Sequence, residues 1–298
     1  MDQYPLLTER LGFPNGTKAL IVTCDCLGFC HSCNIGIYDV LRNGIATSAR
    51  LIVPAPWSRD AVVRYRGEDV GVELTLNSSN PILHFGPLTQ SPSLLDGQGG
   101  FPVTLEDLWD HADLAETRRE CRAQIERAIY WGFDVSHIAS ELDALIMRPE
   151  FFDILLELAI EFDLPISLPD YLNEERIGFP VKTLAFEEGA IFPDRVIDPF
   201  SAYEPIDPAS QDLIEDAIFS VEEGVTELCI RPAQDTPELR AITPEWATFV
   251  SQKTAASERR HFDHLLSRAN ITLISYREIR NRARAIKGGT RSHRSNYV

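Results

Sequence analysis

The stretch ALIVTCDCLGFCHSCNIGIYDVLRNGIATSARLIVPA, residues 19–55, decides the fold. It contains an apolar run over 19–25, helix-like spacing over 34–44 and a second apolar run over 47–55. A strand, a helix and a strand in this order indicate two parallel strands joined by a covering helix. We expect Asn43-Gly44 to end the helix, because glycine adopts the positive φ that many helix ends require.

The same alternation continues along the chain. Further strands are predicted within residues 69–77, 135–145, 225–233 and 271–275. Further helices are predicted within residues 114–133, 148–165, 210–224, 257–270 and 276–286. In the first of these helices Gly132 is the expected end, and Ile125, Ala128 and Ile129 are expected to face inward. Two long segments, 78–102 and 172–207, have the polar or irregular composition that is typical of lid loops.

These patterns favour one α/β domain. The sequence contains no internal repeat and no linker between domains, so one closed or nearly closed α/β barrel is expected over residues 1–285. Residues 286–298 are basic and contain glycine and serine, and we expect them to form a frayed tail.

The composition of the chain limits the classes of partner that we expect it to bind. The 298 residues carry a net charge of −17, which repels phosphate backbones and anionic membranes, so neither nucleic acid nor a membrane is expected as a partner. An uncharged or cationic small molecule fits this charge better. The chain has no apolar run long enough to span a bilayer and no signal-peptide pattern at its start, so we expect a cytoplasmic protein. The sequence does not decide the oligomeric state and leaves a homodimer open.

Candidate functional residues lie where the predicted strands end, because those loops form the active face of parallel α/β folds. Asp25 and Cys26 follow the first strand, Glu141 follows the strand that starts at residue 135, and Arg231 ends the strand that starts at residue 225. Glu73 alternates with apolar neighbours, so its side chain faces either the barrel lumen or the solvent. Glu141 has the alternative of an ordinary loop carboxylate.

The cysteines and one histidine have simpler explanations. Cys24, Cys26, Cys30 and Cys33 lack the paired spacing of a structural zinc site, and a buried strand cysteine packs as a small apolar residue. His137 lies in a predicted strand, where a hydrogen-bonded core histidine is more common than a ligand.

Several segments together resemble the YdjC-like carbohydrate deacetylase family. They include residues 21–57, GEDVGVELTLN (67–77), PSLLDGQGGFP (92–102) and SHIASELDAL (136–145). The resemblance implies a distorted TIM-like (β/α) barrel. It also implies a divalent metal that holds the water attacking an N-acetyl group, with Asp25 in the position of the catalytic base.

The chain departs from the family at the positions that the resemblance assigns to metal ligands. Cys26 stands in place of an aspartate, and Glu73 and Glu141 stand in place of histidines. Arg231 replaces a further histidine, and Ser167 replaces an arginine. Cysteine and two glutamates form a donor set of mixed hardness, so no metal or other cofactor is expected.

We therefore expect a metal-independent acid/base enzyme that acts on a small polar or secondary-metabolite-like substrate. Converging carboxylates repel one another, so at least one should stay protonated near neutral pH. The predicted catalytic residues are Asp25, Glu73, Glu141 and Arg231, and the predicted pocket residues are Cys26, His137 and Ser167. Two alternatives remain open. One is residual metal-dependent N-deacetylation, and the other is a non-catalytic saccharide-binding or scaffold protein in which Arg231 and glutamates fill the pocket.

Overall fold

A curled parallel sheet forms the centre of the protein. The computed structural model describes residues 4–78, 80, 82–201, 206–209 and 212–294, and within them the sheet has seven strands. They are β1 (Lys18–Leu27), β2 (Ser48–Leu51), β3 (Val70–Leu74), β4 (Val135–Ser140), β5 (Arg195–Ile197), β6 (Gly224–Ile230) and β7 (Ile271–Leu273). Their order is β4-β3-β2-β1-β6-β5, β7 pairs with β1, and every pairing is parallel.

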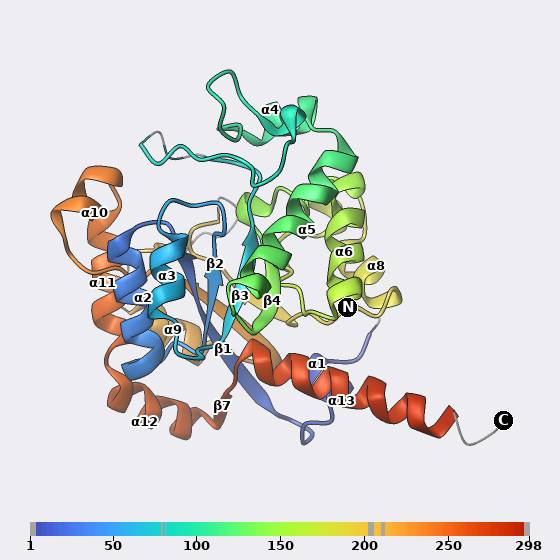
Figure 1. Cartoon of the computed structure of the whole chain (residues 1–298). Helices are drawn as coiled ribbons and strands as arrows, with labels where there is room; N and C mark the ends of the chain where they lie inside the picture. Colours follow the sequence, from blue (N-terminus) through green and yellow to red (C-terminus); the bar gives the residue numbers. More distant parts are fainter. Residues whose placement is uncertain (1–3, 79, 81, 202–205, 210–211, 295–298) are drawn as a thin grey trace.

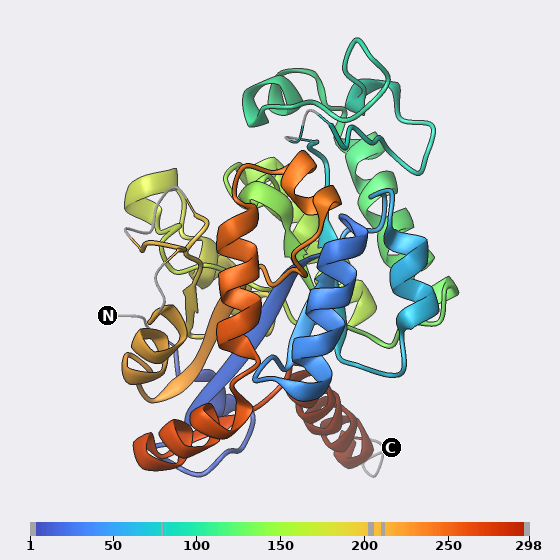
Figure 2. The same ribbon diagram turned by 90° about the vertical axis from the view of Figure 1, so that its left-hand side faces the viewer.

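Helices follow most strands, as expected for parallel β-strands joined by crossover connections. The longer helices are α2 (His31–Asn43), α5 (Leu114–Tyr130), α6 (Pro149–Phe162), α11 (Trp246–Ala256), α12 (Arg259–Ala269) and α13 (Tyr276–Arg294). The shorter ones are α1 (Leu7–Arg10), α3 (Ser58–Arg64), α4 (Leu105–His111), α7 (Glu174–Ile177), α8 (Val181–Glu187), α9 (Leu213–Phe219) and α10 (Pro237–Ile242), with 3₁₀ turns at η1 (Pro92–Leu94) and η2 (Glu141–Asp143). Figure 1 shows α13 extending away from the body, and Figure 2 shows α2 beside α11 on one face of the sheet.

Strand β1 has three neighbours. Residues 18–20 of β1 pair with both β6 and β7, whereas residues 23–27 pair with β2. β7 therefore adds its three residues to the sheet at the start of β1.

The two edges of the sheet approach each other without a continuous ladder. The amide of Ile138 on β4 donates to Pro165 and that of Ser167 donates to Ile138, both at 2.9 Å. The amide of Ile166 donates in turn to Ile191 at 2.8 Å. Residues 165–167 thus pair with the β4 edge, and the expected distorted α/β barrel is confirmed in the form of a curled half-barrel.

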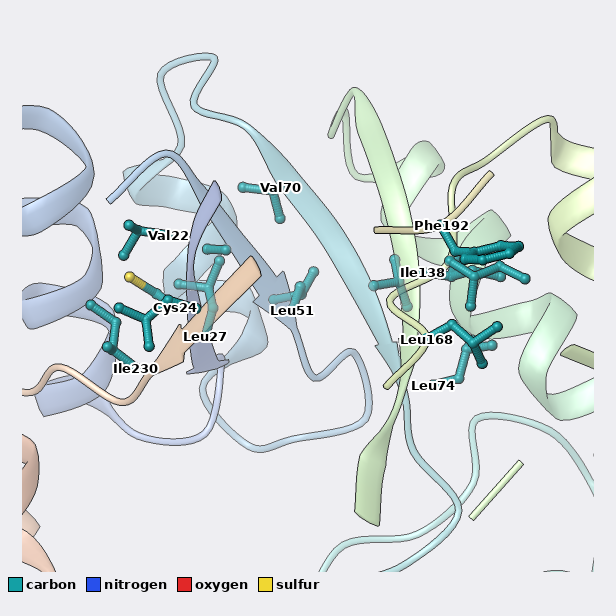
Figure 3. Close-up of a cluster of buried hydrophobic side chains, with 14 of the residues drawn as sticks. Val22, Cys24, Leu27, Leu51, Val70, Leu74, Ile138, Leu168, Phe192 and Ile230 are labelled. Atoms are coloured by element: carbon teal, nitrogen blue, oxygen red, sulfur yellow. The ribbon is translucent and has the colours of Figure 1, made fainter. Parts of the chain in front are cut away.

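Successive side chains along each strand point alternately to the apolar core and to the barrel interior. In Figure 3 Val22 and Cys24 of β1 lie with Ile230 of β6 in the buried cluster, and all three are fully buried. Because neighbouring side chains on a strand point to opposite faces, Asp25 points away from Cys24 and into the barrel. The structure thereby confirms Cys24 as a packing residue.

Glycine at position 44 has a different role from the one expected. Helix α2 ends at Asn43, but Gly44 has φ −104°, which any residue adopts. A Cβ at this position would lie 2.3 Å from the carbonyl oxygen of Ala256. The glycine is required by the close approach of α11, not by a positive φ.

Other expectations differ in detail. Ile129 is 48% exposed although Ile125 and Ala128 are buried. The segment 172–207 is more regular than a lid loop, since it contains α7, α8 and β5. The expected frayed tail is helical as far as Arg294, and residues 295–298 lie outside the described part. None of the helices in the described part is both long and apolar enough to cross a bilayer.

Candidate active site

A cavity of about 240 Å³ lies where the strands end. Five strands contribute to its walls, with Asp25 on β1, Arg50 on β2, Glu73 on β3, Ser140 on β4 and Cys229 on β6. The segments that follow β4, β5 and β6 contribute further polar and aromatic residues, among them Glu141, Asp143, Ser167, Tyr171, Asp198, Phe200, Ser201 and Arg231. Of the sequence-predicted residues, Asp25, Glu73, Glu141, Ser167 and Arg231 meet here.

A bulge near the end of β1 sets the position of Asp25. The register between β1 and β2 shifts between Cys24 and Leu27, and Cys26 in the bulge has φ +69°. Bulges change the direction of a strand and of its side chains. Asp25 lines the cavity, whereas Cys26 is not among its lining residues. Burial raises the pKa of the Cys26 thiol more than nearby Arg231 lowers it, so Cys26 stays protonated.

Arg50 lies at the centre of the site and was missed in the sequence. It sits on β2 and is 6% exposed. Its Nη1 lies 3.2 Å from Oδ1 of Asp25 and 3.7 Å from Oε2 of Glu73. Burial disfavours its charge, but the surrounding acidic groups hold its pKa above the ordinary value. The sequence did contain a signal for Arg50, because it is a single charged residue within a predicted apolar strand.

Below the cavity Arg50 belongs to a network that we call the inner ionic layer, made of Arg50, Ser167, Glu227 and Tyr276. Nη2 of Arg50 donates to Oε1 of Glu227 at 2.6 Å and to Oγ of Ser167 at 2.6 Å. The hydroxyls of Ser167 and Tyr276 both donate to Oε2 of Glu227 at 2.6 Å. Both carboxylate oxygens of Glu227 therefore have partners in an interior closed to water.

Above it lies a second group, the outer carboxylate layer, made of Asp25, Glu73 and Glu141. Burial raises the pKa of Asp25 to about 7, against the opposing effect of Arg50 and Arg231. Burial also raises the pKa of Glu73 well above its usual range, and that of Glu141 less strongly. Oδ1 of Asp25 and Oε2 of Glu73 are buried and accept no hydrogen bond within the described part of the chain.

Two further acidic residues join the pocket and were not predicted. Asp143 follows β4 with φ +58°, and the hydroxyl of Tyr171 donates to its Oδ2 at 3.3 Å. Burial raises the pKa of Asp143 to about 7, and Asp198 adds to the shift. The path of a loop after a strand decides such placements, so the sequence pattern alone does not reveal them.

Arg231 lies at the wall of the cavity and makes few contacts. Its guanidinium packs over the ring of Phe200, 4.0 Å from the ring centre. Its Nε lies 3.9 Å from Oδ2 of Asp25 and makes no hydrogen bond to a described residue. An arginine that filled the pocket would pair closely with a glutamate and leave little space, and this open geometry counts against that alternative.

His137 lies in the barrel core below the cavity. Its ring stacks on Tyr276 with 3.8 Å between ring centres, and its Nδ1 is 2.8 Å from the hydroxyl of Ser136. A Cβ at Gly71 would lie 2.4 Å from Nδ1, so glycine leaves room for the ring. Burial lowers the pKa of His137 well below its usual range, and Arg50 adds to this effect, so the ring is neutral. Unlike Ser167, it does not line the pocket.

The residues present do not fit a divalent cation. Only Glu73 and Glu141 of the three ligand positions implied by the resemblance face the cavity. The guanidinium of Arg50 already lies beside Asp25 and Glu73, where it would repel a second cation. Among the residues that the structure describes, no group of three or more His, Cys, Asp or Glu side chains is arranged to hold a metal ion.

Comparisons with known proteins agree with this architecture. The profile of the YdjC-like protein family matches residues 19–272. A carbohydrate deacetylase of Thermus thermophilus is 34% identical over 247 residues, covering 81% of this chain and 87% of that protein. One from Thermoanaerobacter pseudethanolicus is 28% identical, covering 76% and 85%. A solved structure from Enterococcus faecalis, described as a cellobiose-phosphate cleavage protein, matches with a TM-score of 0.74 and 21% identity over 88% of this chain and 99% of that one, which supports the fold alone.

Proposed function

We propose, from the premise that this chain belongs to the YdjC-like family, that it is an acid/base enzyme working without a metal on a small polar substrate in the barrel-top pocket. The family model spans most of the chain, and the relatives named above are carbohydrate deacetylases. A carbohydrate or a similarly hydroxylated, secondary-metabolite-like molecule is the substrate class that follows.

One observation carries the proposal. The outer carboxylate layer brings three acidic side chains with raised pKa values into one cavity, between the guanidinium groups of Arg50 and Arg231. Carboxyl groups whose pKa values lie near the working pH can exchange protons with a substrate at neutral pH. Raised pKa values in a cleft are typical of functional sites.

The environments suggest how the roles divide. Glu73 is the most deeply buried and has the strongly raised pKa, so it is the proton donor. Glu141 is less buried, and none of the described residues pairs with its carboxylate, so it is the proton acceptor. Asp25, with a pKa of about 7, relays a proton or acts as the base itself. Arg231 stabilises negative charge that develops on a substrate oxygen.

Arg50 has a different role, that of a positioning residue. It is held by Glu227 and Ser167 beneath the cavity, and it lies within ion-pair distance of Asp25 and Glu73 above them. Its fixed charge keeps these two carboxyl groups from moving apart through mutual repulsion.

An untargeted substrate screen tests the proposal. Wild-type protein is compared with the Glu73→Gln, Glu141→Gln double variant, each with and without a chelator. We expect turnover that the double substitution abolishes and the chelator leaves unchanged. Turnover that is indifferent to both substitutions would refute the acid/base assignment.

The same samples distinguish the main rival, residual deacetylation of an amino sugar by a bound metal. Acetate release from N-acetylated saccharides is measured alongside the metal content of protein purified without added ions. Acetate release that a chelator stops would establish the rival, whereas its absence together with chelator-resistant turnover supports the proposal.

A further inference from the structure

The charges around the cavity are unbalanced. Five acidic side chains line it, namely Asp25, Glu73, Glu141, Asp143 and Asp198, against two guanidinium groups, those of Arg50 and Arg231. Arg50 is also paired at 2.6 Å with Glu227, which lies beneath the cavity. The charge of Arg50 is thus already shared with a sixth acidic residue. At about pH 8, above the pKa of about 7 of Asp25 and of Asp143, these two carboxylates are ionised, and a negative potential remains in the space where a ligand would lie even with Glu73 neutral.

A second observation concerns hydrogen bonding. Glu73 is 4% exposed, lines the cavity, and its Oε2 accepts no hydrogen bond from the described residues. Oδ1 of Asp25 likewise accepts no hydrogen bond from the described residues, although Nη1 of Arg50 lies 3.2 Å from it, and Glu141 also lines the cavity. Buried acceptors without donors are costly, so they point to donors supplied by a ligand.

We infer that the pocket takes an organic cation, a hydroxylated small molecule whose ammonium group faces the outer carboxylate layer. The inference rests on the proposed function for the location of the site and adds the chemical class of the ligand. An ammonium group carries a positive charge and several N–H donors, which match the buried oxygens of Asp25 and Glu73 that accept no hydrogen bond from the described residues.

An organic cation fits this cavity better than a metal ion does. The acidic side chains come from different walls, and no three of them within the described part of the chain converge as metal ligands. An extended ligand can instead place its ammonium group near the carboxylates and a hydroxyl oxygen near Arg231, whose Nε–H donates to none of the described residues and is available to the ligand.

Three compounds with the same hydroxylated six-carbon chain test the inference, namely N-methylglucamine as the cation, sorbitol as the neutral compound and gluconate as the anion. Their binding to the full chain is measured by isothermal titration calorimetry at about pH 8, where an alkylammonium with a pKa of about 10 keeps its charge. We expect N-methylglucamine to bind at least about tenfold more tightly than sorbitol and gluconate to bind most weakly. Added salt should weaken only the binding of the cation.

Matched variants identify the groups responsible. Glu141→Gln removes one acidic charge with little change of shape and should reduce the preference for N-methylglucamine over sorbitol about tenfold. Glu9→Gln removes the same charge from exposed α1, outside the pocket, and should leave the preference unchanged. Sorbitol or gluconate binding as tightly as N-methylglucamine, or no binding of any of the three, would overturn the inference.

The outcome is separate from that of the proposed function, because the titration needs no turnover. Cation-selective binding by a protein without turnover would support the inference and refute the enzyme. Carboxylate-dependent turnover of neutral compounds without cation selectivity would support the enzyme and refute the inference.

Discussion

The inner ionic layer and the outer carboxylate layer both contain buried acidic side chains, but they differ in whether the carboxylate oxygens accept hydrogen bonds. In the inner layer both oxygens of Glu227 accept hydrogen bonds, from Arg50, Ser167 and Tyr276. In the outer layer buried oxygens of Asp25 and Glu73 accept none from the described residues. Asp25 and Glu73 are buried as Glu227 is, so the difference between them lies in how completely their oxygens are hydrogen-bonded.

This difference separates structural from functional acidic groups. A satisfied buried network fixes the fold, and removing one member leaves another charge unpaired. An incompletely satisfied network costs stability and is retained where a site needs reactive groups. Breaking the inner layer should therefore unfold the protein, whereas breaking the outer layer should stop its chemistry.

The largest effect is expected from Arg50→Met. The substitution keeps an unbranched side chain but leaves Glu227 as an uncompensated buried carboxylate, so the free energy of unfolding should fall by about 4 kcal/mol. Urea denaturation followed by circular dichroism measures the loss. Arg231→Met is the control, because the side chain of Arg231 is 22% exposed with a single 3.9 Å ion pair. An equal loss in both variants would contradict the distinction between the layers.

Glu227→Gln and Glu73→Gln compare the two layers directly. Glu227→Gln weakens the contacts to Arg50 and should cost about 3 kcal/mol. Burial raises the pKa of Glu73 well above its usual range and so favours the neutral carboxyl group, which the amide of Gln resembles, and Glu73→Gln should change stability by less than about 0.5 kcal/mol. Activity should fall at least about 100-fold in Glu73→Gln. Destabilisation by Glu73→Gln as large as that by Glu227→Gln would show that the layers are equivalent.

Tyr276→Phe removes one donor to Glu227 and retains the ring that stacks on His137. A hydrogen bond to a charged group contributes about 2 kcal/mol, which is the expected loss in urea denaturation. Tyr130→Phe, at a side chain that is 85% exposed, is the matched control and should change nothing measurable. A loss below about 0.5 kcal/mol would mean that the Glu227 network has a substitute donor.

Asp143, which lines the same cavity as the outer carboxylate layer, should make the stability depend on pH. The pKa of Asp143 is about 7 in the folded state, above an ordinary value of about 3.9, so the folded protein binds this proton more tightly. Stability should therefore fall as the pH rises from about 4 to about 7. Asp143→Asn, which tolerates the left-handed backbone, should reduce this slope by up to about 1.4 kcal/mol per pH unit. Thermal melts across this pH range measure the slope, and the exposed Asp153→Asn variant is the control. Equal slopes in the two variants would contradict the raised pKa of Asp143.

Glu141→Gln should have the smallest effect on stability, below about 0.5 kcal/mol, because no described residue pairs with its carboxylate. Its effect on turnover should match that of Glu73→Gln. Full activity in this variant would remove Glu141 from the proposed acid/base pair and leave Asp25 as the base.

The strand and helix order was predictable from the sequence because hydrophobic periodicity reports which face of an element is buried. Glu73 was recognised by the same reasoning, as a charged residue between apolar neighbours. Arg50 and Glu227 carry an identical signal inside their strands. The expectation that functional residues follow strand ends leaves out the barrel interior. There Arg50 on β2 and Glu227 on β6 form an ion pair.

Other residues depend on information that a local pattern lacks. Asp143 and Asp198 reach the pocket because of the paths taken by loops, and Cys26 does not line it because of a one-residue bulge. The role of Gly44 depends on a helix more than 200 residues later in the chain, which no local rule contains.

The three neighbours of β1 have a consequence for the order of synthesis. β1 is among the first strands made, yet β6 begins at Gly224 and β7 at Ile271. At a ribosomal rate of about 5–20 residues per second, β1 would wait roughly 10–40 seconds for β6. During that interval residues 23–27 of β1 can pair with β2, whereas residues 18–22 lack their later partners β6 and β7. We therefore expect nascent chains that stop before β6 to need chaperone protection, and Asp25 to reach its final place only when the last strands arrive.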